Sequence, residues 1–172
     1  IADNAGRASG VIAAAGGGGK VLQVVGSTKT DTHSGNADSW VDSGLSQAIT
    51  PTATSSKILV LVSLTYQGPT DNNARFKMVR DSSDVCVSDA SGSRLRAYAM
   101  MTRDNAQGMQ VAGISFLDPN TPADTTTAIT YKMQCRATGD TQTWYINDAK
   151  TSNDNAHYNK GASSIVLLEI GA

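Results

Sequence analysis

Arg94, Arg96 and Tyr98 place two guanidinium groups and an aromatic ring within five residues of one another. Guanidinium groups bind anionic oxygens through paired hydrogen bonds, and an aromatic ring attracts cations and stacks on flat groups. The three residues are therefore a candidate contact for an anionic or sugar ligand, such as a receptor glycan. The alternative is an exposed strand edge without a ligand. The segment from Arg94 to Met101 fits a strand and a helical turn equally well.

The four glycines Gly16 to Gly19, followed by Lys20, have the composition of a phosphate-binding loop. Such a loop requires Ser or Thr directly after the lysine to bind magnesium, and a glycine at its first position. Val21 and Ala14 occupy those two places. The sequence therefore predicts no nucleotide site, and we expect no cofactor.

The histidines and the acidic clusters give no pattern typical of a metal site. His33 and His157 lie in polar segments, without Cys or a second His at metal-ligand spacing. The clusters 71–73 and 153–155 contain Asp and Asn, whose oxygens bind calcium, but they lack the alternating acidic spacing and terminal Glu of a dedicated loop. We interpret them as solvated turns. No Gly-X-Ser-X-Gly nucleophile elbow occurs, and we predict neither a metal site nor catalytic residues.

The two cysteines, Cys86 and Cys135, both lie in apolar, strand-like segments. Cysteine packs well as a small buried side chain without being oxidised. Both interpretations therefore stay open, a single disulfide or two free thiols.

Charge and composition narrow the class of protein. The 172 residues include 14 basic and 15 acidic side chains, and this balance lacks the basic excess of a nucleic-acid-binding domain. The longest apolar run, Lys57 to Tyr66, is far shorter than the roughly 20 residues of a membrane span, so no membrane insertion is predicted. Low charge, short apolar runs and many Ser, Thr, Gly and Asn residues are typical of an all-β protein.

The run Lys57 to Tyr66 is the strand around which we expect the fold to form. Alternation places Ile58 and Tyr66 on one face, and Leu59 and Leu61 on the other, so that the strand is apolar on both faces. A second apolar run, Ser164 to Ile170, closes the chain. We predict that the two runs lie side by side in the middle of one sheet. Either a second layer or another copy of the chain covers the extra apolar face. The candidate oligomer-interface residues are Leu59, Leu61, Tyr66, Val166 and Leu168.

Strand-like segments recur at a spacing of roughly ten residues, without a sustained helical period. Besides the two apolar runs they are 20–32, 45–50, 75–80, 84–87, 110–117, 131–136 and 143–147. With nine or ten strands, they predict a two-sheet antiparallel sandwich or jelly roll.

Turn residues suggest how some of these segments connect. The sequence 81–83, Asp-Ser-Ser, predicts a hairpin, and Gly139-Asp140 predicts that 131–136 and 143–147 form another. Residues 34–39 are predicted to be a turn. At least one of Trp40 and Trp144 is expected in the core.

Residues 1–19 differ from the rest of the chain. They are rich in Ala and Gly with little to bury, which predicts a flexible N-terminal arm or linker. Residues 20–172 are predicted to form one β-sandwich head domain.

Several segments, taken in order, resemble one family. These segments are 19–25 (Gly-Lys-Val-Leu-Gln-Val-Val), 42–45 with 49–51 (Ile-Thr-Pro), 54–63, 116–119 (Phe-Leu-Asp-Pro) leading to 130–134, and 163–170. As a set they resemble the C-terminal head domains of fibre-like virion proteins of tailed bacteriophages, especially marine ones. The resemblance covers about Lys20 to Ala172.

The resemblance implies a role as well as a fold. It implies a trimeric head similar to tumour-necrosis-factor-like jelly rolls, carried on the virion as a tail-fibre tip or a capsid decoration and assembled in the host cytoplasm. The N-terminal arm would attach the head to other virion proteins, and loops of the head would bind a host-surface glycan. We expect no enzymatic activity. The alternative from another class is a carbohydrate-binding or polysaccharide-cleaving sandwich, which for cleavage requires two carboxylates within about 5–10 Å.

Overall fold

A computed structural model describes residues 19–69, 74–101, 108–118, 126–138, 142–149 and 159–171, and it is all-β in these ranges. Its strands are β1 (Val21–Lys29), β2 (His33–Gly35), β3 (Val41–Ile49), β4 (Lys57–Gln67), β5 (Ala74–Arg80), β6 (Ser83–Val85), β7 (Ala99–Met101), β8 (Gln110–Asp118), β9 (Ile129–Ala137), β10 (Trp144–Ile146) and β11 (Ser163–Ile170). Most of the predicted arm, residues 1–18, lies outside the described residues, as do His157 and the clusters 71–73 and 153–155.

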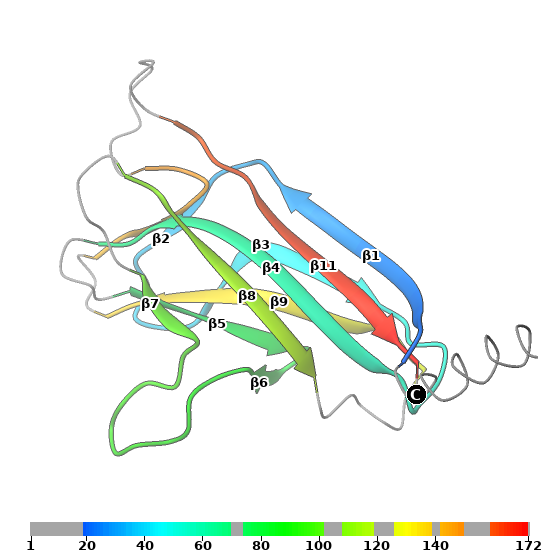
Figure 1. Cartoon of the computed structure of the whole chain (residues 1–172). Helices are drawn as coiled ribbons and strands as arrows, with labels where there is room; N and C mark the ends of the chain where they lie inside the picture. Colours follow the sequence, from blue (N-terminus) through cyan, green and yellow to red (C-terminus); the bar gives the residue numbers. More distant parts are fainter. Residues whose placement is uncertain are drawn as a thin grey trace, which may run out of the picture.

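The strands form two antiparallel sheets (Figure 1). The six-stranded sheet has the order β1-β11-β4, with β8 on the other edge of β4, and the short β10 and β2 continue beside the end of β4. The five-stranded sheet has the order β3-β9-β5, and β6 and β7 share the far edge of β5. Four strands, β2, β6, β7 and β10, have only three residues each. With β7 kept as the edge strand beside β5, and the other three set aside, the two sheets read 1-11-4-8 and 3-9-5-7. This is the arrangement of a jelly roll, and the predicted fold class is confirmed.

The prediction for the two apolar runs is confirmed. β4 and β11 pair over seven residues, with Val60 opposite Leu167, and β8 pairs with the other edge of β4. One face of β4 is buried along its whole length against the second sheet, because it contributes Ile58, Val60, Val62 and Leu64 to the core. The hydrophobic core therefore lies between the sheets, as alternation along the strand requires.

Trp144 is fully buried, which confirms the expectation that at least one tryptophan lies in the core. The centroid of its ring is 5.4 Å from that of His33 on the paired strand β2. Trp40 is partly buried, and the Lys77 ammonium lies 4.6 Å from its ring centroid. His33 therefore serves as a packing partner of a core tryptophan.

Two predictions about short segments are wrong. Segments 131–136 and 143–147 do not form a hairpin, because β9 belongs to the five-stranded sheet and β10 pairs with β4 and β2 in the other. The predicted turn at 34–39 begins instead as β2, whose residues pair with β10. The hairpin predicted at 81–83 is present: β5 and β6 pair around Asp81, which has a φ of 52°.

A buried carboxylate links the two sheets. Asp118, at the end of β8, accepts hydrogen bonds from Arg80 Nη1 at 2.7 Å and from the Tyr131 hydroxyl at 2.8 Å. Burial, and then the charge of Asp118, raise the pKa of Tyr131 well above its ordinary value. The tyrosine therefore stays a hydrogen-bond donor to this carboxylate at all ordinary pH values.

Both cysteines are free thiols, which decides between the two interpretations left open. Cys135 is fully buried in β9, and burial raises its pKa. Cys86 is partly buried after β6, and burial also raises its pKa.

Candidate functional site

The outer face of the six-stranded sheet is apolar across four neighbouring strands. We call this surface the apolar face. Its members, as the strand register places them, are Val21, Val24, Leu59, Leu61, Val111, Leu117, Val166, Leu168 and Ile170.

The register of the sheet brings these side chains together. Val24 of β1 lies opposite Leu168 of β11, which lies opposite Leu59 of β4, which in turn lies opposite Leu117 of β8. Four large apolar side chains thus form one row across the sheet, because directly opposed residues point to the same face. Val166 and Leu61 form the middle of the next row.

The apolar face is exposed to solvent in the single chain. Val24 is 57% exposed, Leu117 46% and Leu61 38%, whereas Leu59, Val166 and Leu168 are partly covered. Among the described residues of this sheet face, alternation leaves one charge, Lys57, at the end of β4.

The outer face of the five-stranded sheet is different, because charged residues cover it. Lys132 Nζ lies 2.8 Å from Asp42 Oδ2, and Arg136 Nη2 lies 2.8 Å from Asp38 Oδ1. A sheet of a soluble sandwich normally presents such a polar outer face to water. The contrast between the two sheets identifies the apolar face as the unusual one.

Of the predicted interface residues, Leu59, Leu61, Val166 and Leu168 lie on the apolar face, but the assignment of Tyr66 is wrong. Tyr66 is on the core face of β4 and is only 7% exposed. Its ring centroid lies 5.6 Å from that of Phe76, and its hydroxyl hydrogen-bonds to Gln110 Oε1 at 3.0 Å. Alternation along β4 explains this, since Tyr66 has the parity of Ile58 and Leu61 has the opposite one.

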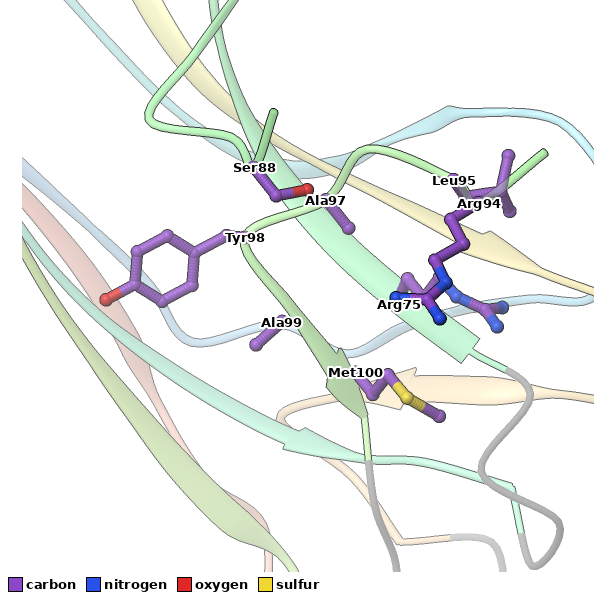
Figure 2. A pocket seen from close by; sticks show the side chains of 8 residues that line it. All are labelled: Arg75, Ser88, Arg94, Leu95, Ala97, Tyr98, Ala99 and Met100. Carbon is purple, nitrogen blue, oxygen red and sulfur yellow. The ribbon is translucent and has the colours of Figure 1, made fainter. Parts of the chain in front are cut away.

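A second feature is a pocket at the far edge of the five-stranded sheet, which we call the arginine pocket (Figure 2). Its volume is about 340 Å³, at the lower end of the range for small-molecule sites. The lining residues are Arg75, Ser88, Arg94, Leu95, Ala97, Tyr98, Ala99 and Met100.

The pocket contains two of the three residues that the sequence singled out. Arg94 and Tyr98 line it, whereas Arg96 does not, and its Nε donates a hydrogen bond to the Ser88 carbonyl at 2.8 Å. Arg96 therefore holds the loop, rather than facing the pocket. In Figure 2 the Tyr98 ring points away from the Arg94 side chain. The ring stacks on Phe76, with the two centroids 5.7 Å apart, so one side of the ring packs against the core.

Arg75 is the pocket residue that the sequence did not indicate. It lies on β5, opposite Met100 of β7. This pairing places the Arg75 side chain in the pocket that Arg94 and Met100 also line (Figure 2). Only the pairing of β5 with β7 brings these residues together. A cue existed in the alternation of β5, which places Arg75 on the outer face.

Neither a metal centre nor a membrane-spanning helix is found in the described part of the chain. No group of three or more His, Cys, Asp or Glu side chains within the described residues is arranged to hold a metal ion. No helix in these ranges is long and apolar enough to cross a bilayer.

The fold and these surfaces define the class as an all-β jelly-roll domain with one apolar sheet face and one cationic pocket. Comparison with protein-family models and with curated protein sequences finds no match for the chain.

Proposed function

We propose that this protein is a non-enzymatic virion structural protein of a tailed bacteriophage, a homotrimeric head that forms a tail-fibre tip or a capsid appendage. The N-terminal arm attaches the head to other virion proteins, and the head binds a glycan of the host surface. The assignment to a phage particle rests on the sequence resemblance. The oligomer rests on the structure of the apolar face.

The observation that carries the proposal is the row formed by Val24, Leu168, Leu59 and Leu117. Monomeric soluble proteins rarely expose large contiguous apolar patches, and those that do usually cover them with a partner. Burial of apolar area is the main favourable term in stable association.

A second copy of the chain is the partner that fits this surface best. Homo-oligomers are the commonest soluble assemblies, and their permanent interfaces are as apolar as a domain core. The near absence of charge on the face favours a permanent interface over a transient one. Threefold symmetry follows from the likeness to trimeric virion heads, in which three copies surround one axis.

The test is the solution mass, measured by light scattering with size-exclusion chromatography. The expected mass is three times the 17.9 kDa of the chain. A mass of one chain at micromolar concentration would refute the oligomer, and with it the structural role of the apolar face. A mass of two chains would keep the interface and refute the trimer.

The second candidate is a carbohydrate-binding or polysaccharide-cleaving module, which the arginine pocket favours. One assay distinguishes cleavage from binding alone: purified protein is incubated with bacterial surface polysaccharide, and the size of the products is measured. We expect no oligosaccharide release. Released oligosaccharides would contradict the non-enzymatic assignment and would imply a catalytic pair of carboxylates, since glycoside cleavage requires one.

A further inference from the structure

We propose that the arginine pocket binds the oxyanion group, a carboxylate or a phosphate, of an acidic sugar residue. This inference rests on the proposed function in one respect, because it gives the chemical class of the glycan that the head recognises. Its ligand groups are the guanidinium groups of Arg75 and Arg94.

The charge in the pocket is not balanced locally. Two of its lining side chains are cations, and within the described residues its lining includes no acidic side chain. Elsewhere on the same sheet face, cations are paired with carboxylates: Lys77 with Asp84, Lys132 with Asp42 and Arg136 with Asp38. Two neighbouring cations without a counter-ion repel each other, and an anion between them removes that repulsion.

The two guanidinium groups also have donors to spare. Arg75 uses Nη1 in a hydrogen bond to Thr138 Oγ1 at 2.7 Å, which orients the group and leaves other N–H groups for a ligand. The Arg94 guanidinium makes no hydrogen bond or ion pair with the described residues, while its backbone N–H is held by the Ser91 carbonyl at 3.1 Å. A fork of N–H donors matches the geometry of carboxylate and phosphate oxygens.

The remainder of the lining fits a sugar ring. Leu95, Ala97 and Met100 provide an apolar surface against which the C–H face of a pyranose can pack, and the Ser88 hydroxyl points toward the pocket (Figure 2). A volume of about 340 Å³ suits a single sugar residue better than the surface of a folded protein partner. An apolar wall with a few convergent polar groups is typical of small-ligand sites. A single saccharide unit at the end or on a branch of a polymer is thus the occupant that we favour over an acidic peptide.

The experiment uses the full chain labelled with ¹⁵N at arginine, and follows the side-chain Nε–H signals by NMR. Three probes of similar size are titrated to millimolar concentration: D-glucuronate, D-glucose 6-phosphate and neutral D-glucose. We expect the signals of Arg75 and Arg94 to shift with at least one charged sugar and to stay unchanged with glucose. The charged sugar that binds more tightly identifies the oxyanion.

Variants test the two cations. Arg94→Ala and Arg75→Ala should each weaken binding of the charged sugar at least tenfold, and Arg94→Lys should restore only part of it, because lysine keeps the charge and loses the fork. Lys132→Ala is the charge-matched control, since Lys132 lies on the same sheet face but not in the pocket, and it should bind as the unaltered chain does. Circular dichroism spectra and unfolding temperatures confirm that each variant is folded.

Several outcomes would overturn the proposal. If glucose binds as tightly as the charged sugars, the pocket does not recognise the charge. If the arginine variants bind the charged sugar as tightly as the unaltered chain does, the binding site lies elsewhere. No shift with any of the three probes would also refute it. The dipeptide Asp-Asp is titrated in the same way, and tighter binding of this acidic peptide than of either charged sugar would refute the assignment to a sugar. If the protein is a trimer but binds neither charged sugar, only the proposal for the arginine pocket is refuted. If it is a monomer that binds a charged sugar, only the proposed trimer is refuted.

Discussion

At the scale of single residues, Glu169 shows how this fold holds a buried charge. The carboxylate is fully buried in β11, where it accepts hydrogen bonds from Gln23 Nε2 at 2.7 Å and from the Thr52 backbone N–H and hydroxyl at 2.7 and 2.8 Å. Burial by itself would raise the pKa of Glu169, but the hydrogen bonds from Gln23 and Thr52 outweigh this and lower it to about 2. The side chain thereby ties β1 and the segment before β4 to β11.

This lowered pKa predicts a pH dependence of stability. The folded pKa of about 2 is below the ordinary 4.5, so the folded state favours the ionised carboxylate. Its contribution is complete above about pH 5 and is lost as the pH falls from 4.5 toward 2, by roughly 3 kcal/mol in the free energy of unfolding. Glu169→Gln should remove this part of the pH dependence and be less stable at pH 7, because an amide N–H group would then face Gln23.

Urea unfolding of both proteins from pH 2 to 7 measures the difference. If the two curves stay parallel below pH 5, Glu169 is not the group that titrates. Gln47→Glu adds a carboxylate at a partly buried position of β3, without the hydrogen bonds around Glu169, and should not show the same loss on acidification.

Asp118 is a second residue whose replacement has a defined cost. Asp118→Ala leaves the Arg80 guanidinium and the Tyr131 hydroxyl without this acceptor between the sheets. Removing one partner of a buried ion pair typically costs about 3–5 kcal/mol. We expect a loss of that size in chemical denaturation.

Asp42→Ala is the matched control for Asp118→Ala. Asp42 pairs with Lys132 at the surface, with half of its side chain exposed, and such pairs contribute about 0–1 kcal/mol. Equal losses in the two variants would show that the buried pair is no more important than the surface pair.

At the scale of elements, the short strands β2 and β10 extend the six-stranded sheet beyond the end of β4. Gly35 of β2 lies opposite Trp144 of β10, and a Cβ on Gly35 would come within 2.6 Å of the Trp144 ring. The ring is fully buried and cannot move away freely. The close approach of β2 to β10 therefore depends on glycine.

Gly35→Ala should destabilise the protein by about 1–3 kcal/mol, because overpacking displaces the tryptophan. Gly113→Ala, in β8, is the control, since a Cβ there meets no atom of the same chain within 4 Å. It should be neutral or slightly stabilising, because alanine has less backbone freedom to lose on folding. The free energies of unfolding and the near-ultraviolet circular dichroism of Trp144 distinguish the two. An unchanged spectrum for Gly35→Ala would contradict the packing argument.

At the scale of the whole molecule, the apolar face determines how chains associate. Leu61 lies in its middle, between Val166 of β11 and Ser115 of β8. If three copies bury this face, Leu61→Lys places an unpaired charge in an apolar interface, which costs several kcal/mol. The variant should sediment as a single folded chain.

Ala48→Lys is the control for this variant, because Ala48 is exposed on the outer face of the other sheet, opposite Thr130. It should keep the mass of the unaltered protein. The stability of each isolated chain should change little, since both positions are at the surface. If both lysine variants keep the original mass, the apolar face is not the interface.

The sequence predicted those parts of the fold that depend on local patterns better than those that depend on contacts between segments far apart in the chain. Alternation along the run Lys57 to Tyr66 sufficed to predict a central strand with two apolar faces, and the second apolar run predicted its neighbour β11, because each run is a local pattern of large apolar residues. The strands β2 and β10 were missed or mispaired. A three-residue strand has no pattern of its own, and the turn signal at Gly139-Asp140 does not specify which sheet the next strand joins.

The candidate surfaces follow the same division. Period-two alternation was sufficient to place Leu59 with Leu61, and Val166 with Leu168, on a second apolar face. Tyr66, which was predicted to belong to the same interface, lies in the core. Only the tertiary structure added Val24 and Leu117, through the register of β1 and β8, and only the pairing of β5 with β7 placed Arg75 in the pocket with Arg94. The physical reason is that side-chain direction is a property of one strand, whereas neighbourhood across a sheet depends on loop closure and packing between segments far apart in the chain.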